Sequence, residues 1–456
     1  MTPTPAAAPP PARPAPGAST RPGAPFPGTG PAGGVLATRA PGAVTTTGPA
    51  TVAAPRPGRL SRTPARLRLA ALVAVLACAV VAVSGLGVGL AQADALRSAG
   101  AATEQQVRTL DVRNDLVAAD ATATNAFLVG GREPVSQRER YDAWLASASG
   151  GLTAVAGADA GDAALLAPVS TSLAVYSGLV EQARANNRQG FPVGAAYLEA
   201  ASQELRDGAL PGLDDVVAAT DSRVSSAFTT AGRAGLVLLL AGSALVVLVG
   251  VQVWLASRTH RRLNAGLVLS TIVLVAATFL LGASLDGGSR AAADVQDGAY
   301  ADTVDLARAY SLANDAKAAE SFTLIKRGSG QAYEEAYAAN VEEATALLGR
   351  GSPDLRARFD AWTGTHAEIR ALDDGGDWDG AVALATSTEA DSPNDRFDAF
   401  AEAAQEETRA ASGAVHADLE RAARASQRSA WVALVAGVLA AAAALWGFSP
   451  RLKEYR

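Results

Sequence analysis

The chain has few of the residue types on which most catalytic and metal sites depend. Its single cysteine, Cys78, lies inside an apolar run, so the chain forms no internal disulfide and the thiol is expected to pack rather than react. Its three histidines, His260, His366 and His416, lie far apart and lack the spacing of metal ligands. The sequence also contains no hydrolase nucleophile motif, phosphate-binding loop, zinc-peptidase motif or cysteine cluster. We therefore predict that the protein is not an enzyme and has no cofactor or metal.

Aromatic residues are scarce as well. They make up 5% of the chain although hydrophobic residues make up 49%, so the apolar fraction consists mainly of Ala, Val and Leu. This composition favours membrane helices and thin, alanine-rich bundles over a large mixed core. The net charge of −6 is modest and gives no indication of a nucleic-acid partner. Paired carboxylates such as Asp214-Asp215 and Glu334-Glu335 fall on polar helix faces, where solvated side chains are far commoner than an acid–base pair.

The most prominent feature of the sequence is a set of four apolar runs without charged residues. Each is about twenty residues, roughly the length that a helix needs to cross a ~30 Å hydrocarbon core. Two of them flank a short basic link, which we assign to the cytoplasm because positive charge is retained on that side. Its basic residues, our candidate cytoplasmic partner site, are Arg258, His260, Arg261 and Arg262. Basic residues also precede the first run and follow the last, so we expect a multi-pass plasma-membrane protein, in contact with lipids, with both termini in the cytoplasm.

The predicted fold is an all-α membrane protein with four transmembrane helices, two extracytoplasmic antiparallel helical bundles and a disordered, Pro/Ala-rich N-terminal tail. The predicted order is tail 1–65, span 66–92, bundle 93–232, span 233–256, link 257–264, span 265–284, bundle 285–428, span 429–448 and tail 449–456. Within the first span, Gly85 and Gly89 form a small-residue pair that suits close helix packing, including a possible homodimer; ordinary helix flexibility is the alternative.

Helical periodicity and glycine turns divide the two polar segments into helices. The predicted helices are Glu104–Val129, Pro134–Ala156, Ala163–Asn187, Val193–Ala231, Ala291–Lys326, Gln331–Leu348, Asp354–Leu372 and Arg396–Ala430. The two segments also resemble each other, because aligning Phe127 with Phe322 places Asp120 opposite Asp315 within alanine-rich runs. We interpret this as a parallel internal duplication; chance similarity between alanine-rich helices is the alternative.

A polar cluster at the end of the third predicted helix is our candidate site for an outer partner. Arginine and amide side chains gather there just before a Gly-Phe-Pro turn, and such groups suit recognition of polar or carboxylate groups. The candidate residues are Arg184, Asn186, Asn187, Arg188, Gln189, Phe191 and Tyr197. The alternative is a helix C-terminus whose cations complement the helix dipole.

This stretch, with Leu198–Ser202 and Leu210-Pro211 after it, resembles the GlnX family of actinobacterial four-span membrane proteins. The similarity of architecture extends over nearly the whole chain, and the Ala-, Gly-, Arg- and Pro-rich composition with few lysines is typical of high-GC actinobacteria. The resemblance implies a sensory role. It implies that the protein passes information from an extracytoplasmic amino-acid-binding lipoprotein, GlnH, to a cytoplasmic Ser/Thr kinase, PknG. It supplies no catalytic residues.

The sequence itself is compatible with such an adaptor, because the predicted cytoplasmic parts contain no kinase or other output domain. We expect a partner to bind the basic link and the tails, where Ser61 and Thr63 are candidate phosphoacceptors. The main alternative is a membrane scaffold of the cell envelope without a ligand-dependent signal. A transporter is disfavoured, because the spans contain no Asp, Glu, Lys or Arg at mid-depth and we expect no buried polar residues in them. Direct ligand binding within a bundle, at Arg113 or Arg308, is a further alternative.

Overall fold

The computed structural model describes residues 63–130, 133–190, 192–232, 235–259, 264–349 and 352–453. The chain divides into two units, Met1–Arg56 and Pro57–Arg456, and the described residues all belong to the second. Their regular structure is entirely helical, which confirms the predicted fold class at that level. Most of the predicted tail 1–65 and four residues of the predicted link (His260, Arg261, Arg262 and Leu263) lie outside the described residues.

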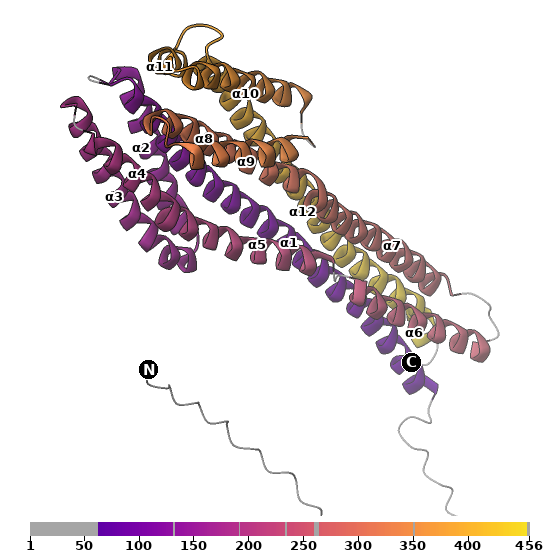
Figure 1. Cartoon of the computed structure of the whole chain (residues 1–456). Coiled ribbons are helices and arrows are strands. Elements are labelled where there is room, and N and C mark those ends of the chain that lie inside the picture. The colour runs from indigo at the N-terminus through magenta and orange to yellow at the C-terminus, as the bar shows by residue number, and fades with distance from the viewer. Residues whose placement is uncertain are drawn as a thin grey trace, which may run out of the picture. The chain divides into compact units, whose positions relative to one another are not determined.

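Twelve α-helices and two short π-helical turns make up the described part of the chain (Figure 1). They are α1 (Thr63–Leu128), α2 (Val135–Ala158), α3 (Ala160–Arg188), α4 (Val193–Glu204), η1 (Leu205–Ala209), α5 (Leu210–Gly232), α6 (Gly235–Thr259), α7 (Ala265–Asp294), η2 (Val295–Ala299), α8 (Tyr300–Ile325), α9 (Gln331–Leu348), α10 (Pro353–Asp374), α11 (Trp378–Thr386) and α12 (Pro393–Lys453).

The predicted helix bounds agree closely for α2, α3, α9 and α10, and they disagree in three respects. The helix α11 was not predicted. The predicted helix Val193–Ala231 is interrupted by η1, and the helix that follows the third apolar run is interrupted by η2. The first and last apolar runs also continue without a break into the outer helices, so α1 contains 66 residues and α12 contains 61.

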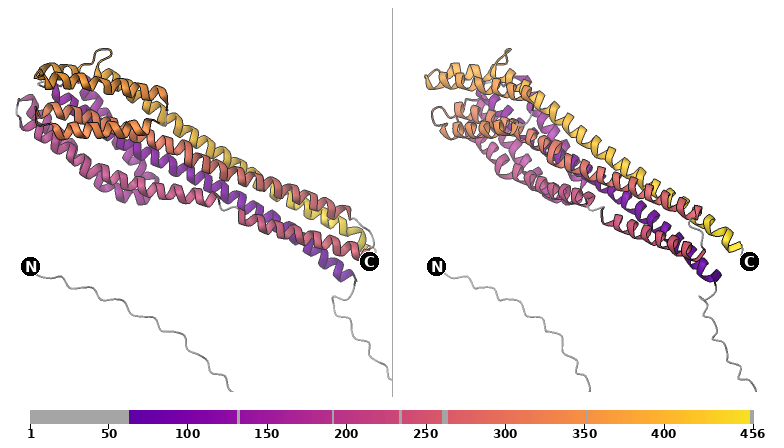
Figure 2. Two further views of the ribbon diagram at one scale, coloured as in Figure 1. Left: turned by 45° about the vertical axis from the view of Figure 1, so that its right-hand side comes forward. Right: turned by 90° about the vertical axis from the view of Figure 1, so that its right-hand side faces the viewer.

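Four helices lie side by side at the end of the unit farthest from α11: α1, α6, α7 and α12 (Figures 1 and 2). Large apolar side chains on this end face outward, with Leu239, Val246 and Phe279 each more than 70% exposed. Such a surface is unfavourable in water and favourable in lipid. By length and composition, five described helices are able to cross a membrane: these four and α3.

Small residues set the distance between α1 and α12. A Cβ atom built on Gly89 would lie 2.6 Å from the Cβ of Ala430, and one on Gly437 would lie 2.4 Å from the Cβ of Ala82. Gly85 faces Ala433 in the same way. The predicted small-residue pair therefore packs against α12 of the same chain, where the absence of side chains allows the two backbones to approach closely.

Polar side chains also lie between the apolar helices, contrary to our prediction. Ser270 of α7 is fully buried and its Oγ lies 3.5 Å from the Sγ of Cys78. The Nε2 of Gln252 donates to the carbonyl of Leu267 at 3.1 Å and to the hydroxyl of Thr271. Hydrogen-bonded neutral groups of this kind stabilise contacts between membrane helices. Only the absence of Asp, Glu, Lys and Arg at mid-depth of the apolar runs therefore disfavours a transporter.

Two helical bundles occupy the other end of the unit, and they share an interface. The core of the first bundle, formed by α1 to α5, includes Phe322 of α8, and Tyr333 of α9 packs against it. The helices α1 and α8 are in contact, and most residues of 309–324 are buried. The prediction of two bundles did not include this interface, because periodicity within one helix does not identify its partner.

The second bundle buries charged groups beside an aromatic core of Phe359, Trp362 and Phe400. The ring of His366 stacks on Tyr337 at 3.7 Å, and its two nitrogens lie 2.9 Å from Glu320 and 3.0 Å from Glu334. The ammonium of Lys317 donates to the other oxygen of Glu320 at 2.7 Å.

The pKa values of this cluster shift in the directions that pairing requires. Burial raises the pKa of Glu320, but Lys317 and His366 outweigh it and hold the pKa at about 2. Burial lowers the pKa of His366, but its contacts with Glu320 and Glu334 outweigh that effect and raise the pKa above the ordinary 6.5. The cluster is therefore most stable with His366 charged.

We predict that replacing Gly89 with leucine destabilises the protein by about 1–3 kcal/mol, because the new side chain forces α1 and α12 apart. Gly87 is the matched control, since it is exposed and a Cβ there meets nothing within 4 Å. Thermal unfolding in detergent or nanodiscs would show a lower transition temperature for Gly89→Leu and little change for Gly87→Leu. Equal effects of the two substitutions would contradict the close packing.

We further predict a pH-dependent contribution from His366. Its raised pKa gives stability that is complete below the unfolded value of 6.5 and is lost as the pH rises through the folded value. The loss of stability in His366→Gln should therefore be larger at about pH 6 than at about pH 9. His416→Gln, on the exposed surface of α12, is the control and should show no such trend in thermal unfolding. If the loss of stability in His366→Gln were larger at high pH than at low pH, the histidine would not be paired as described.

Candidate functional site

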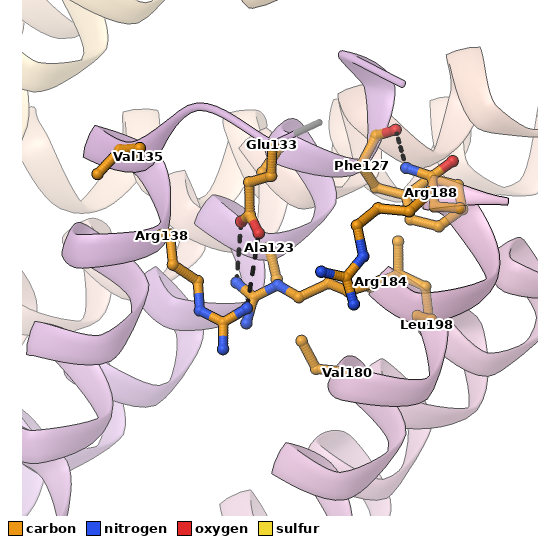
Figure 3. A pocket seen from close by; sticks show the side chains of 12 residues that line it. Ala123, Phe127, Glu133, Val135, Arg138, Val180, Arg184, Arg188 and Leu198 are labelled. Atoms are coloured by element: carbon orange, nitrogen blue, oxygen red, sulfur yellow. Dashed lines mark hydrogen bonds and ion pairs between the residues drawn. The ribbon is translucent and has the colours of Figure 1, made fainter. Parts of the chain in front are cut away.

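A pocket of about 190 Å³ opens at the tip of the first bundle, farthest from the apolar helices (Figure 3). The turns that join α1 to α2 and α3 to α4 lie at the same tip, because the helices alternate in direction. The pocket is lined by Ala123, Ala126, Phe127, Glu133, Val135, Arg138, Val180, Ala183, Arg184, Asn187, Arg188 and Leu198. We call it the tip pocket.

Arg184 of α3 is the most buried charge in the tip pocket, with 9% of its surface exposed. Its guanidinium donates to Glu133 at 3.0 Å (Figure 3). It also donates to Glu181 at 2.8 Å and lies over the ring of Tyr141 at 4.1 Å. Burial raises the pKa of Tyr141 although Arg184 opposes this, so the phenol stays neutral beneath the cation. The Nε of Arg184 has no hydrogen-bond partner among the described residues.

Two further arginines give the tip pocket an excess of positive charge. The guanidinium of Arg138 lies 2.9 Å from Glu181 and 3.9 Å from Glu133, so it competes for the same carboxylates as Arg184. Arg188 lines the pocket from the last turn of α3, is exposed, and makes no hydrogen bond or ion pair with any described residue. The pocket therefore presents an unneutralised guanidinium, which suits a carboxylate or another anionic group.

A tight turn fixes this end of α3. Gly190 has a φ of +70°, a conformation that side chains disfavour, and it follows Gln189, the C-cap residue of the helix. The Nδ2 of Asn187 donates to the carbonyl of Phe127 at 2.9 Å and so ties α3 to the end of α1. Gly194 at the start of α4 leaves no room for a side chain, since a Cβ there would lie 3.1 Å from the carbonyl oxygen of Ala183.

The structure brings together three residues of the predicted outer site, Arg184, Asn187 and Arg188. The side-chain amides of Asn186 and Gln189 instead donate to carbonyls of their own helix, at 2.8 and 3.1 Å, and neither residue lines the pocket.

The other predicted site residues lie elsewhere. Tyr197 is partly buried against the core of the bundle, and Phe191 lies outside the described residues. Of the predicted cytoplasmic site, Arg258 is exposed in the last turn of α6. Asn264, the last residue of the predicted link, caps α7 and donates to the carbonyl of Gly447 in α12 at 2.8 Å.

Sequence reasoning missed Glu133 and Arg138, which complete the tip pocket from the start of α2. An antiparallel bundle places its first and third turns at the same end, so the position of Glu133 near Arg184 was available as a signal. Among the described residues, no group of three or more His, Cys, Asp or Glu is arranged to hold a metal ion.

Comparison with protein families gave one finding. Residues 79–229 match the model of an actinobacterial sensor domain, a range that contains most of α1, all of α2 to α4 and the tip pocket. Neither curated proteins nor solved structures gave a match. The match supports an actinobacterial sensor protein.

We predict that Arg184→Met destabilises the protein by about 2–4 kcal/mol, because it removes the closest cation from the partly buried Glu133 and from the buried phenol of Tyr141. Arg188→Met is the matched control, since this side chain is exposed and unpaired within the described structure and should change stability by less than about 0.5 kcal/mol. Thermal or denaturant unfolding measures both. If the two substitutions were equally harmless, Arg184 would have no structural part in the pocket.

Proposed function

We propose that this protein is a four-span membrane sensor that relays amino-acid availability from an extracytoplasmic solute-binding lipoprotein to a cytoplasmic Ser/Thr kinase, without catalysis of its own. The match to a sensor domain supports the sensory role. The resemblance to the GlnX family supports the two partners.

One observation carries the proposal: a single unbroken helix connects the tip pocket to the apolar end. Ala123, Ala126 and Phe127 of α1 line the pocket, and the same helix begins at Thr63, before the first apolar run. A partner that contacts the pocket therefore contacts a helix that also passes through the membrane. A small shift or tilt of a rigid helix is an established way to transmit a signal between two packing states.

We assign the spans to α1, α6, α7 and α12, and not to α3. The helix α3 is apolar enough to be a candidate, but its buried Asp162 forms an ion pair with Arg223 at 2.8 Å, and its Arg184 pairs with Glu133. Charged groups of this kind are unfavourable in hydrocarbon. With four spans both termini lie on one side of the membrane, and we place them, with Arg258, in the cytoplasm.

The proposal includes an internal duplication of the span–bundle–span unit. In the first bundle a cation from the third helix covers a buried tyrosine of the second helix, as Arg184 covers Tyr141. In the second bundle His366 of α10 stacks on Tyr337 of α9. A shared side-chain arrangement of this kind supports duplication over the chance similarity of two alanine-rich sequences.

The two aligned aspartates give further support. Asp120 and Asp315 lie 3.6 and 3.8 Å from the same guanidinium, that of Arg206. Burial raises the pKa of both carboxyls, and the guanidinium of Arg206 opposes this rise at the contact between the bundles. A relative movement of the bundles would change this contact, which makes it suitable for coupling them.

The test uses the full-length protein in nanodiscs and the organism's amino-acid-binding lipoprotein. We expect the lipoprotein to bind with an affinity that depends on added aspartate or glutamate. A scaffold without a ligand-dependent signal would bind the lipoprotein equally with and without the amino acid. Arg188→Gln should weaken binding by about tenfold, and Gln189→Glu, which changes the charge by the same amount outside the pocket, by less than about twofold. Binding that is indifferent to amino acid would rule out the sensory role.

A second arm tests the output. A cytoplasmic Ser/Thr kinase should be retained by the intact protein and lost when residues 257–264 are scrambled. If the kinase is retained equally well after the link is scrambled and both tails are removed, then neither the link nor the tails bind it, and the proposed output is wrong.

A further inference from the structure

A second cavity, of about 210 Å³, lies between the two bundles and is separate from the tip pocket. Its walls come from α1, α2, α8 and α12, with Thr388 from the segment between α11 and α12. It is therefore formed by residues of both bundles. Its size is below that of pockets for drug-sized ligands, which are about 300 Å³ or more, so it suits a small metabolite. We call it the inter-bundle cavity.

Buried amide groups form one wall of the inter-bundle cavity. Asn125, Gln137 and Asn314 are each at least 90% buried. The Nε2 of Gln137 donates to the Oδ1 of Asn125 at 3.2 Å, and the Nδ2 of Asn125 donates to the carbonyl of Ala385 at 3.1 Å. The Oε1 of Gln137 is buried and has no hydrogen-bond partner within the described structure. An unsatisfied buried acceptor is unfavourable, and a ligand with a donor group would satisfy it.

Charges of both signs line the same cavity. Lys317 is 3% exposed and its ammonium, which has three donors, makes one hydrogen bond within the described structure, to Glu320. Arg140 of α2 donates to both oxygens of Asp398 in α12, at 3.1 and 2.9 Å, and so links the two bundles at the rim. Asp395 is a second carboxylate in the lining.

Aromatic side chains supply the apolar part of the lining. These are Trp144, Tyr310 and Phe397. A few polar groups of fixed position beside apolar walls are typical of sites for small organic ligands. The tip pocket differs, since arginines predominate in it and it has a single carboxylate in its lining.

We propose that the inter-bundle cavity binds a free α-amino acid directly. The ligand carboxylate would lie toward Lys317 and Arg140, and its ammonium toward Asp398 and Asp395. A donor on the ligand would satisfy the Oε1 of Gln137. An α-amino acid would offer a partner of each sign, so that Arg140 and Asp398, which pair with each other in this structure, would each gain a contact in place of that ion pair.

Such a ligand would act as a bridge between the bundles. It would contact α1 and α2 on one side and α8 and α12 on the other, and α1 and α12 both continue into the apolar end. Occupancy would therefore favour one relative position of these two helices. This inference deepens the proposed sensory function and rests on it for its consequence, but the binding itself requires no partner protein.

The test is isothermal titration of the full-length protein in nanodiscs with each proteinogenic L-amino acid, to about 10 mM. We expect at least one to bind with a Kd between about 1 µM and 1 mM. Arg140→Gln, Asp398→Asn and Gln137→Leu should each weaken this binding by about tenfold or more. Arg138→Gln, two residues away on the same helix but in the tip pocket, is the control and should weaken it by less than about twofold.

Two analogues test the chemistry of the ligand. Glutarate lacks the ammonium and n-butylamine lacks the carboxylate, and neither should bind. The inference is overturned if no amino acid binds, if all three cavity substitutions leave binding unchanged, or if an analogue binds as tightly as the amino acid. Thermal unfolding of each variant confirms that it is folded.

The outcomes also separate this inference from the proposed function. If the protein responds to the lipoprotein but binds no free amino acid, direct binding is overturned and the proposed relay stands. If it binds an amino acid in the inter-bundle cavity but does not respond to the lipoprotein, the relay is overturned and direct binding stands.

Discussion

The contact between α1 and α12 is the constraint on which the rest of the structure depends. These two helices run through both the apolar end and the bundles, and they are in contact along much of that distance. Gly85, Gly89 and Gly437 allow backbone approach where side chains would hold the helices apart. In lipid there is little hydrophobic force between helices, so close packing has to supply the attraction. The bundles are then attached to a pair of helices whose spacing is already set.

In the two bundles, buried charged pairs also determine how the helices pack. Arg184, Lys317 and His366 each lie in a protein interior where an isolated charge is strongly unfavourable, and each has a carboxylate within 3.0 Å. Removal of one member of such a pair is far more harmful than removal of both. The bundles therefore depend on specific partners, although their alanine-rich helices contribute few large side chains. This dependence also fixes which helix faces meet.

Much of the fold could be predicted from the sequence, and the reasons are local. The apolar runs and the glycine turns identified the long helices, because periodicity and turn chemistry act within a few residues. The contact of Phe322 with the first bundle was not predicted, since it joins segments about two hundred residues apart. For the same reason Glu133 was missed as the partner of Arg184. Neither α11 nor the two π-turns were predicted, since α11 contains only 9 residues and a π-turn only 5.

The π-turn η2 has a geometric consequence for the rod that begins at Ala265 and ends at Ile325. A π-turn accommodates one extra residue, so the helix beyond it is rotated by about 100° relative to an uninterrupted α-helix. Before the turn, Ile272 and Phe279 point away from the protein, whereas after it residues 309–324 are surrounded on nearly all sides. The helix beyond η2 therefore presents a different face to the bundles from the one that an uninterrupted α-helix would present. The apolar part of the rod and its buried part thus need not share one helical face.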